Sequence, residues 1–269
     1  MAYRKTILES IYRGGAGHTA GSLSCVDILN VLYNQVMNIT PENFSEVDRD
    51  HYIQSKGHSV EALYTVLADQ GFYSREELLE CLNQSGTNFV GHPTRKIPGM
   101  EHNTGALGHG LSVSVGLALA AKLDQKAYRV FTLLGDGELA EGSSWEAAMT
   151  AAHYKLDNLT AIIDRNKLQI TGSTEEVNAL EPLADKFRAF GFAVREVDGN
   201  DVAALAKLLD SLPFEAGKPN LVLANTVKGK GISFMENVKS WHHKVPSEEQ
   251  LAAAFNELDA AEKALEVTA

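Results

Sequence analysis

The stretch 130-VFTLLGDGELAEGSSWEAAMTAAHYKLDNLTAIIDRNKLQITG-172 decides the fold. Residues 130–134 form a short apolar run without alternation, which predicts a buried parallel strand, and the run stops at Gly135-Asp136-Gly137. Ser143-Ser144-Trp145-Glu146 predicts a capping box, followed by apolar residues at helical spacing. A second apolar run, residues 159–163, ends in Asp164-Arg165-Asn166. The stretch therefore predicts a strand, a loop, a helix beginning near Ser143 and a second parallel strand.

Two oxygen-bearing side chains, Asp136 and Asn166, follow these two strands. A right-handed crossover brings the ends of the two strands close together. Mg²⁺ and Ca²⁺ prefer such oxygen ligands and accept phosphate oxygens in the same shell. Gly135 and Gly137 let the backbone approach a phosphate, and the nearby helix N-terminus offers unpaired N–H groups. Gly-Asp-Gly alone is more often a strand-ending turn, but Asn166 at the matching strand end favours a metal-held diphosphate. We expect Asp136 to face solvent there.

This spacing resembles the thiamine diphosphate (ThDP) fingerprint, and GDGELAEGSSWEA is most similar to the transketolase version. The family often ends its fingerprint in two asparagines, whereas this chain has Arg165-Asn166. The resemblance implies that the metal is bound by Asp136, Asn166 and the carbonyl of Leu168. It also implies that the cofactor is contacted by the neighbouring residues Gly135, Gly137 and Glu138.

Length and composition exclude several classes of protein. A chain of 269 residues can bury a large core, and we expect one domain over 1–269. A net charge of -11 and a pI near 5.3 argue against a nucleic-acid surface. No apolar run approaches the length of a transmembrane helix, and the N-terminus does not read as a secretory signal. Cys25 and Cys81 lie far apart in apolar helical contexts, as free thiols do, which fits a cytoplasmic protein.

Strands are expected near residues 51, 130, 159, 192 and 221, with helices between them. This order predicts an α/β fold: a three-layer αβα arrangement with an open, mainly parallel sheet and ligands at the carboxyl ends of the strands. Ser24-Cys25-Val26-Asp27 predicts a second capping box, and the glycines of 17–23 predict an exposed loop before it. Residues 86–104 are rich in Gly, Pro, Asn and Thr and predict a lid or site wall.

Four histidines, His18, His58, His92 and His109, each follow a glycine. A lone histidine is more often structural than catalytic. A metal-binding cluster would give the same pattern, so a zinc hydrolase must be weighed. The chain has no HExxH and no paired-cysteine spacing, which disfavours zinc.

The transketolase resemblance accounts for these segments together, because it extends in order over GHTAGSLS, SKGH, GHP, TGALGHGLS and the KGKG…WHHK segment. It implies substrate and proton-transfer roles for four histidines: His18, His58, His92 and His242. It implies cofactor contacts from four further residues: Lys56, Gly105, Leu107 and Lys228.

This chain also departs from the family at two further places. Thr19-Ala20 stands where the family commonly has Pro-Gly, and His243 replaces a usual glycine, which leaves the choice between His242 and His243 open. Glu141 matches a family carboxylate that meets its counterpart across the dimer, although a solvated loop glutamate is the ordinary interpretation.

The resemblance implies the N-terminal, diphosphate-binding subunit of a two-chain transketolase, which transfers a two-carbon ketol unit from a ketose, with a phosphorylated ketose favoured, to an aldose. After the His242 segment only a polar, Ala-rich helix remains. We therefore expect a partner subunit that carries the pyrimidine-binding domain, in a dimer of heterodimers. The alternatives are a deoxyxylulose-phosphate synthase-like or 2-oxoacid dehydrogenase α-like subunit, or a non-catalytic nucleotide-binding α/β domain. The sequence does not identify the donor ketose or the acceptor aldose.

Overall fold

The computed structural model describes residues 1–268, and in them one sheet of five parallel strands. The strands are β1 (His51–Gln54), β2 (Val130–Gly135), β3 (Leu159–Arg165), β4 (Ala193–Asp198) and β5 (Asn220–Asn225). They lie in the order β1-β2-β3-β5-β4, and every neighbouring pair is parallel. The predicted α/β fold with an open parallel sheet is confirmed.

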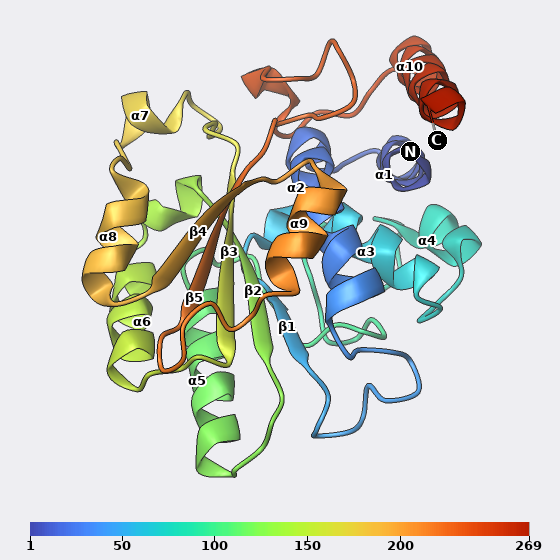
Figure 1. The fold of residues 1–269 in the computed structure, drawn as a ribbon. Helices are drawn as coiled ribbons and strands as arrows, with labels where there is room; N and C mark the ends of the chain where they lie inside the picture. Colours follow the sequence, from blue (N-terminus) through green and yellow to red (C-terminus); the bar gives the residue numbers. More distant parts are fainter. Residues whose placement is uncertain (269) are drawn as a thin grey trace.

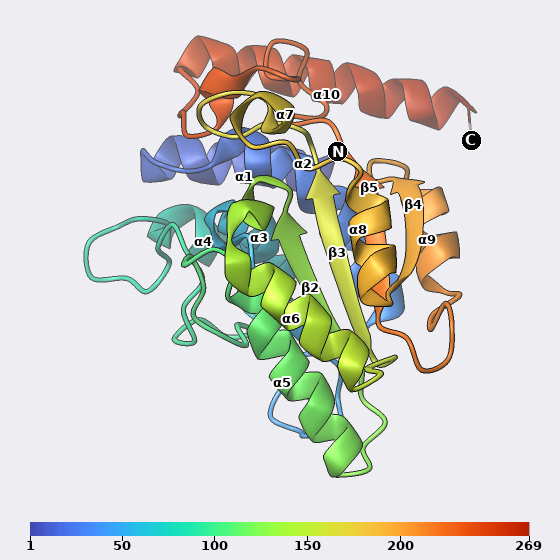
Figure 2. The same ribbon diagram turned by 90° about the vertical axis from the view of Figure 1, so that its left-hand side faces the viewer.

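The register of the central strands brings the polar segments together. Gly135 of β2 pairs with Asp164 of β3, and Asp164 pairs in turn with Ala224 of β5. The carboxyl ends of these three strands are therefore level. The segments that follow Gly135, Arg165 and Asn225 leave the sheet at the same edge, beneath α7 and α10 in Figure 2.

Helices cover both faces of the sheet (Figure 1). Their bounds are α1 (Ala2–Gly14), α2 (Thr19–Val31), α3 (Val60–Asp69), α4 (Arg75–Cys81), α5 (Gly110–Leu123), α6 (Gly142–His153), α7 (Thr174–Val177), α8 (Leu183–Phe190), α9 (Val202–Leu209) and α10 (Glu248–Thr268). α5, α6 and α8 lie on one face, whereas α2, α3 and α9 lie on the other, where α1 packs against α2, α3 and α10. This is the expected three-layer arrangement.

Alternation along the strands divides the interior into two hydrophobic cores. Phe131 and Leu133 of β2 belong to the core under α2 and α3, whereas Val130 and Leu134 belong to the core under α5 and α6. Successive side chains of a strand point to opposite faces, so a strand that is apolar throughout serves both layers.

The start of α2 and two predicted capping boxes differ from the sequence expectation, whereas the predicted helix start near Ser143 is confirmed. α2 begins at Thr19, not at Ser24, and residues 19–23 are buried helix and not an exposed loop. The Ser24 hydroxyl donates to the Gly21 carbonyl and to Asp164, so it is not a cap. α6 begins at Gly142, and Ser143 donates to the Gly108 carbonyl. In both places a serine hydroxyl serves a tertiary contact and the predicted capping box is wrong.

Residues 86–104 contain neither helix nor strand, as their composition predicts, and His92 of this segment lines the cavity described below. Within residues 1–268, the structure has no helix that combines the length and apolar character needed to cross a membrane.

Candidate active site

A cavity of about 380 Å³ opens at the carboxyl edge of the sheet. Its wall includes all the residues that the sequence singled out for the site: His18, Lys56, His58, His92, Gly105, Leu107, Gly135, Asp136, Gly137, Glu138, Asn166, Leu168, Lys228 and His242. Gln169, Ile170 and Thr171 complete it. One end of the cavity is rich in oxygen donors and the other in imidazoles.

The oxygen-rich end is built by the segments after β2 and β3. Asp136 is only 1% exposed, which contradicts the expectation that it faces solvent. Its Oδ1 accepts the Gly137 N–H at 2.8 Å, and its Oδ2 accepts the Lys167 N–H at 2.5 Å and the Arg165 guanidinium at 3.1 Å. Burial, together with nearby Asp164, raises the pKa of the Asp136 carboxyl. Asp136 is therefore part of the packed turn as well as a ligand candidate.

Arg165, where the family often has asparagine, links this turn to the α7 region. Its guanidinium forms ion pairs with Asp136, Glu175 and Glu181 and donates to Thr174. Although burial acts in the opposite direction, these acidic partners raise the pKa of Arg165. The arginine at this position therefore has a structural role, because its side chain connects the Asp136 turn to the segment around α7.

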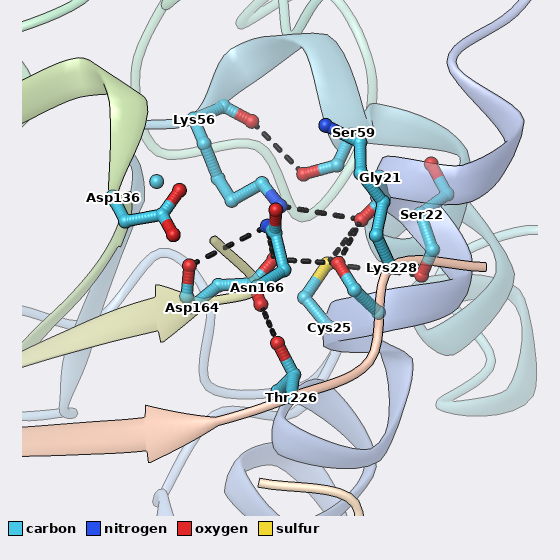
Figure 3. A network of polar contacts seen from close by, with 12 residues as sticks. Gly21, Ser22, Cys25, Lys56, Ser59, Asp136, Asp164, Asn166, Thr226 and Lys228 are labelled. Atoms are coloured by element: carbon cyan, nitrogen blue, oxygen red, sulfur yellow. Dashed lines mark hydrogen bonds and ion pairs between the residues drawn. The ribbon is translucent and has the colours of Figure 1, made fainter. Parts of the chain in front are cut away.

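A buried ion pair underlies the same end of the cavity. Figure 3 shows Lys56, Asn166 and Thr226 converging on Asp164. Lys56 Nζ pairs with Asp164 and donates to the Gly21 carbonyl at 3.2 Å, although the sequence placed Lys56 beside the cofactor. Burial lowers the pKa of Lys56, but Asp164 opposes this effect, and the net pKa lies above its usual value. Both groups therefore stay charged.

Asp164 also orients Asn166. The Asn166 amide nitrogen donates to Asp164 Oδ2 at 3.2 Å, and its oxygen accepts the Leu168 N–H at 3.1 Å. An amide whose nitrogen is engaged in this way keeps its oxygen for other partners.

The Leu168 carbonyl, the third predicted metal ligand, accepts a hydrogen bond from Lys228 Nζ at 2.9 Å. The same amine lies 2.9 Å from His242 Nδ1. Burial and the charge of Lys56 lower the pKa of Lys228 to about 8. Lys228 thus joins the oxygen-rich end of the cavity to the histidine end.

Glycines allow close approach at both ends. Gly105 has φ 135°, and a Cβ there would lie 2.8 Å from the ring of His92. A Cβ on Gly137 would lie 3.0 Å from Gln169. Glu138 lines the cavity, but its carboxylate accepts hydrogen bonds from the N–H groups of Gly108 and Gly135 and so fixes the backbone around Asp136.

At the other end, imidazoles from three other segments surround His18. The ring centroid of His18 lies 5.3 Å from that of His58, 5.7 Å from that of His92 and 5.7 Å from that of His242. Burial, reinforced by neighbouring cations and imidazoles, lowers the pKa of His18 to about 4 and that of His242 to about 3. The cluster is therefore neutral at pH 7 and can accept a proton or donate an N–H.

His243 lies beside the cluster, with its ring 4.7 Å from that of His18, but it is exposed and not part of the cavity wall. His109 is also exposed and outside the wall. Within residues 1–268 no group of three or more His, Cys, Asp or Glu side chains is arranged to hold a metal ion. The zinc-hydrolase interpretation therefore finds no ligand set there.

Two buried acids of this region were missed in the sequence. Asp164 lies near the end of an apolar strand, and Glu61 follows Val60 in the mainly apolar first turns of α3 and is completely buried. The sequence signal that could have revealed these two acids is a charged residue inside an apolar pattern. Such a residue must find polar partners in the interior. Glu141, by contrast, is exposed at the start of α6, and its dimer role stays a prediction.

Comparison with known proteins defines the class to which this fold and site belong. The family model described as transketolase, thiamine diphosphate binding domain, matches residues 2–268. The transketolase from Leishmania mexicana has the same fold, with a TM-score of 0.89 and 30% identity over 96% of this chain, which spans 40% of that longer chain. The chain belongs to the transketolase family.

Two relatives of about the same length are named as subunits of transketolases. This chain is 49% identical, over 95% of its length and 90% of the relative, to one subunit of the apulose-4-phosphate transketolase of Phocaeicola vulgatus. It is 44% identical, over 95% of its length and 93% of the relative, to the SqwG subunit of the 6-deoxy-6-sulfo-D-fructose transketolase of a Clostridium species. This chain is accordingly the ThDP-binding N-terminal part of a split transketolase, as predicted, and acts with a partner subunit. The dehydrogenase, synthase and non-catalytic alternatives are disfavoured.

Proposed function

We propose that the cavity binds ThDP through a divalent metal, Mg²⁺ first and Ca²⁺ as the alternative ion. The ligands from this chain are the Asp136 carboxylate, the Asn166 amide oxygen and the Leu168 carbonyl. All three are hard oxygen donors, the kind that such cations prefer together with phosphate oxygens. Asp164 supports the assignment because it holds the nitrogen of Asn166 and leaves the oxygen as donor.

The remaining predicted residues receive roles around the cofactor. Gly135, Gly137 and Glu138 shape the diphosphate turn, Gly105 and Leu107 form the wall beside the rings, and Lys228 adds positive charge near the phosphates. Lys56 acts on the site indirectly, because its amine is paired with Asp164. When bound, ThDP supplies the carbanion chemistry of ketol transfer.

The imidazoles of His18, His58, His92 and His242 orient the sugar and move protons at its hydroxyl and carbonyl oxygens. Neutral imidazoles suit this task because each ring can accept a proton at one nitrogen and donate from the other. Of the adjacent pair we assign the role to His242, because it lines the cavity and contacts Lys228, whereas His243 is exposed.

The reaction that we assign is transfer of a two-carbon ketol unit from a ketose to an aldose. The names of both two-chain relatives specify sugars that carry an anionic group, phosphate in one and sulfonate in the other. We therefore favour a phosphorylated or similarly anionic sugar, as in pentose phosphate metabolism.

The partner in this proposal is a C-terminal transketolase subunit with the pyrimidine-binding domain, in a cytoplasmic dimer of heterodimers. We treat 1–269 of this chain as its single ThDP domain. Support comes from the names of the two-chain relatives and from the share of the longer transketolase chain that this chain spans. The thiols of Cys25 and Cys81 are both free, which suits the cytoplasm.

The observation that carries the proposal is that one and the same cavity has oxygen donors at one end and four histidines at the other. The test is to isolate the chain that co-purifies with this one and to assay the pair on ketose phosphates with ThDP and Mg²⁺. Metal-dependent ketol transfer is the expected result. Its absence with every ketose and aldose tested, in a pair that binds ThDP, would contradict the assigned reaction.

A further inference from the structure

Glu61 is a buried acid that the proposed reaction does not use. It lies in the first turn of α3, has no exposed surface, and forms no ion pair within residues 1–268. Its Oε1 accepts the main-chain N–H of His18 at 3.1 Å, and its Oε2 accepts the hydroxyl of Ser22 at 2.8 Å. Burial raises the pKa of the Glu61 carboxyl to about 7. A carboxyl group that is costly to bury is thus retained next to the main chain of His18, a residue of the cavity wall.

The carboxylate lies at the N-terminus of α2. His18 is the N-cap residue of this helix, and its side chain makes no capping hydrogen bond. The first turn of a helix carries unpaired N–H groups and partial positive charge, so an acid at this position is favourable. Glu61 therefore provides, from a neighbouring helix, the hydrogen bond to the N-cap N–H that the N3 glutamate of a capping box normally makes.

Packing around Gly17 independently indicates a fixed turn. A Cβ on Gly17 would lie 2.8 Å from Glu61 Oε1 and 2.6 Å from Cγ1 of Ile11. Such distances are too short for any side chain, so only glycine lets the chain before His18 lie this close to Glu61.

The imidazole of His18 has little else to fix it. Its Nδ1 is buried and has no hydrogen-bond partner. Its ring contacts are edge-on approaches to other histidines, which are weakly directional. The direction of the ring therefore depends on the backbone at His18, and that backbone is held by Glu61.

We propose that Glu61 is a positioning residue for the reaction: its carboxylate anchors the main chain at His18 and thereby sets the direction in which the imidazole enters the cavity. This inference rests on the proposed role of His18. A small displacement of a group that orients substrate lowers turnover without weakening cofactor binding at the other end of the cavity.

The experiment compares two neutral replacements of similar size, Glu61→Gln and Glu61→Met, in the enzyme reconstituted with its partner. Only Gln can still accept the His18 N–H. Glu61→Gln should keep kcat within about threefold of the wild type, whereas Glu61→Met should lower kcat about 10- to 100-fold with an unchanged Kd for ThDP. Thermal unfolding shows that each variant is folded at the assay temperature.

A double-mutant cycle with His18→Ala then identifies the route of the effect. Glu61→Met combined with His18→Ala should be no slower than His18→Ala alone, because the two changes remove one function. Additive losses, or equal losses in the Gln and Met variants, would overturn the inference and leave the proposed function intact. Full activity of His18→Ala would instead remove the role of His18, and the inference with it.

Discussion

Asp136 stabilises its own turn as well as serving as a ligand candidate, so its replacement has two consequences. Asp136→Ala should abolish Mg²⁺-dependent ThDP binding. It should also destabilise the chain by about 1–3 kcal/mol, because the Lys167 N–H and part of the Arg165 guanidinium lose a buried partner. Calorimetric titration with ThDP and Mg²⁺ measures the first effect, and denaturant unfolding measures the second.

Asp136→Asn is the matched control, since it keeps an oxygen for the Lys167 N–H but removes the charge. It should lose most of the metal-dependent binding at a smaller cost in stability. If Asp136→Ala or Asn166→Ala binds ThDP with wild-type affinity, the central site assignment is wrong.

His92 lies at the opposite end of the cavity from Asp136, so its effects should be separable from cofactor binding. His92→Ala should reduce turnover by about 10²–10⁴-fold, the usual range for general acid–base groups, with little change in ThDP affinity. Steady-state kinetics of the reconstituted enzyme provide the measurement. Full activity would reduce His92 to a structural part of the loop wall.

His242 and His243 offer a comparison within one segment. His242→Ala should lose far more activity than His243→Ala, because only His242 lines the cavity. The reverse order of kcat values would move the assignment to the neighbouring residue.

Motif residues such as Asp136 and His58 could be predicted because each follows a strand end or a glycine in a characteristic segment. The partners of Lys56 could not, because its amine finds Asp164 only when β3 and α2 are assembled around it. The anchoring by Glu61 was hidden for the same reason, since it depends on how α3 packs against the start of α2.

Among the elements, α5 contains two glycines with opposite surroundings. A Cβ on Gly110 would overlap the side chain of Ser55, whereas a Cβ on exposed Gly116 would meet nothing within 4 Å. Gly110→Ala should therefore destabilise the chain by about 1–3 kcal/mol through overpacking. Gly116→Ala should stabilise it by about 0.5–1 kcal/mol through helix propensity.

Urea denaturation of both variants tests this contrast, which separates packing from propensity within one helix. Equal changes in unfolding free energy at the two positions would show that α5 does not pack closely on the end of β1.

The positions of β2, β3 and β5 were predicted well because each is a short apolar run that ends in a polar segment. Helix caps were harder to predict, since Ser24 and Ser143 have the sequence of capping residues but bind Asp164 and the Gly108 carbonyl. The place of β5 between β3 and β4 is also absent from the sequence pattern, because long connections between parallel strands leave several orders open.

At the scale of the whole molecule, the cavity opens at the surface, and Ile170 in its wall exposes 69% of its surface. An exposed apolar side chain at the mouth of a cofactor site suits a surface that a partner covers. An interface that completes an active site should bury more than about 1,000 Å². We therefore expect the isolated chain to self-associate or to behave poorly in solution.

The dependence on a partner is tested most directly by the rate of ketol transfer by this chain, purified alone and then mixed with its partner subunit, at saturating ThDP and Mg²⁺. We expect no measurable transfer by the chain alone and full activity on reconstitution, because in the proposed function the two polypeptides share the cofactor site. Transfer by the chain alone at the rate of the reconstituted pair would contradict this expectation.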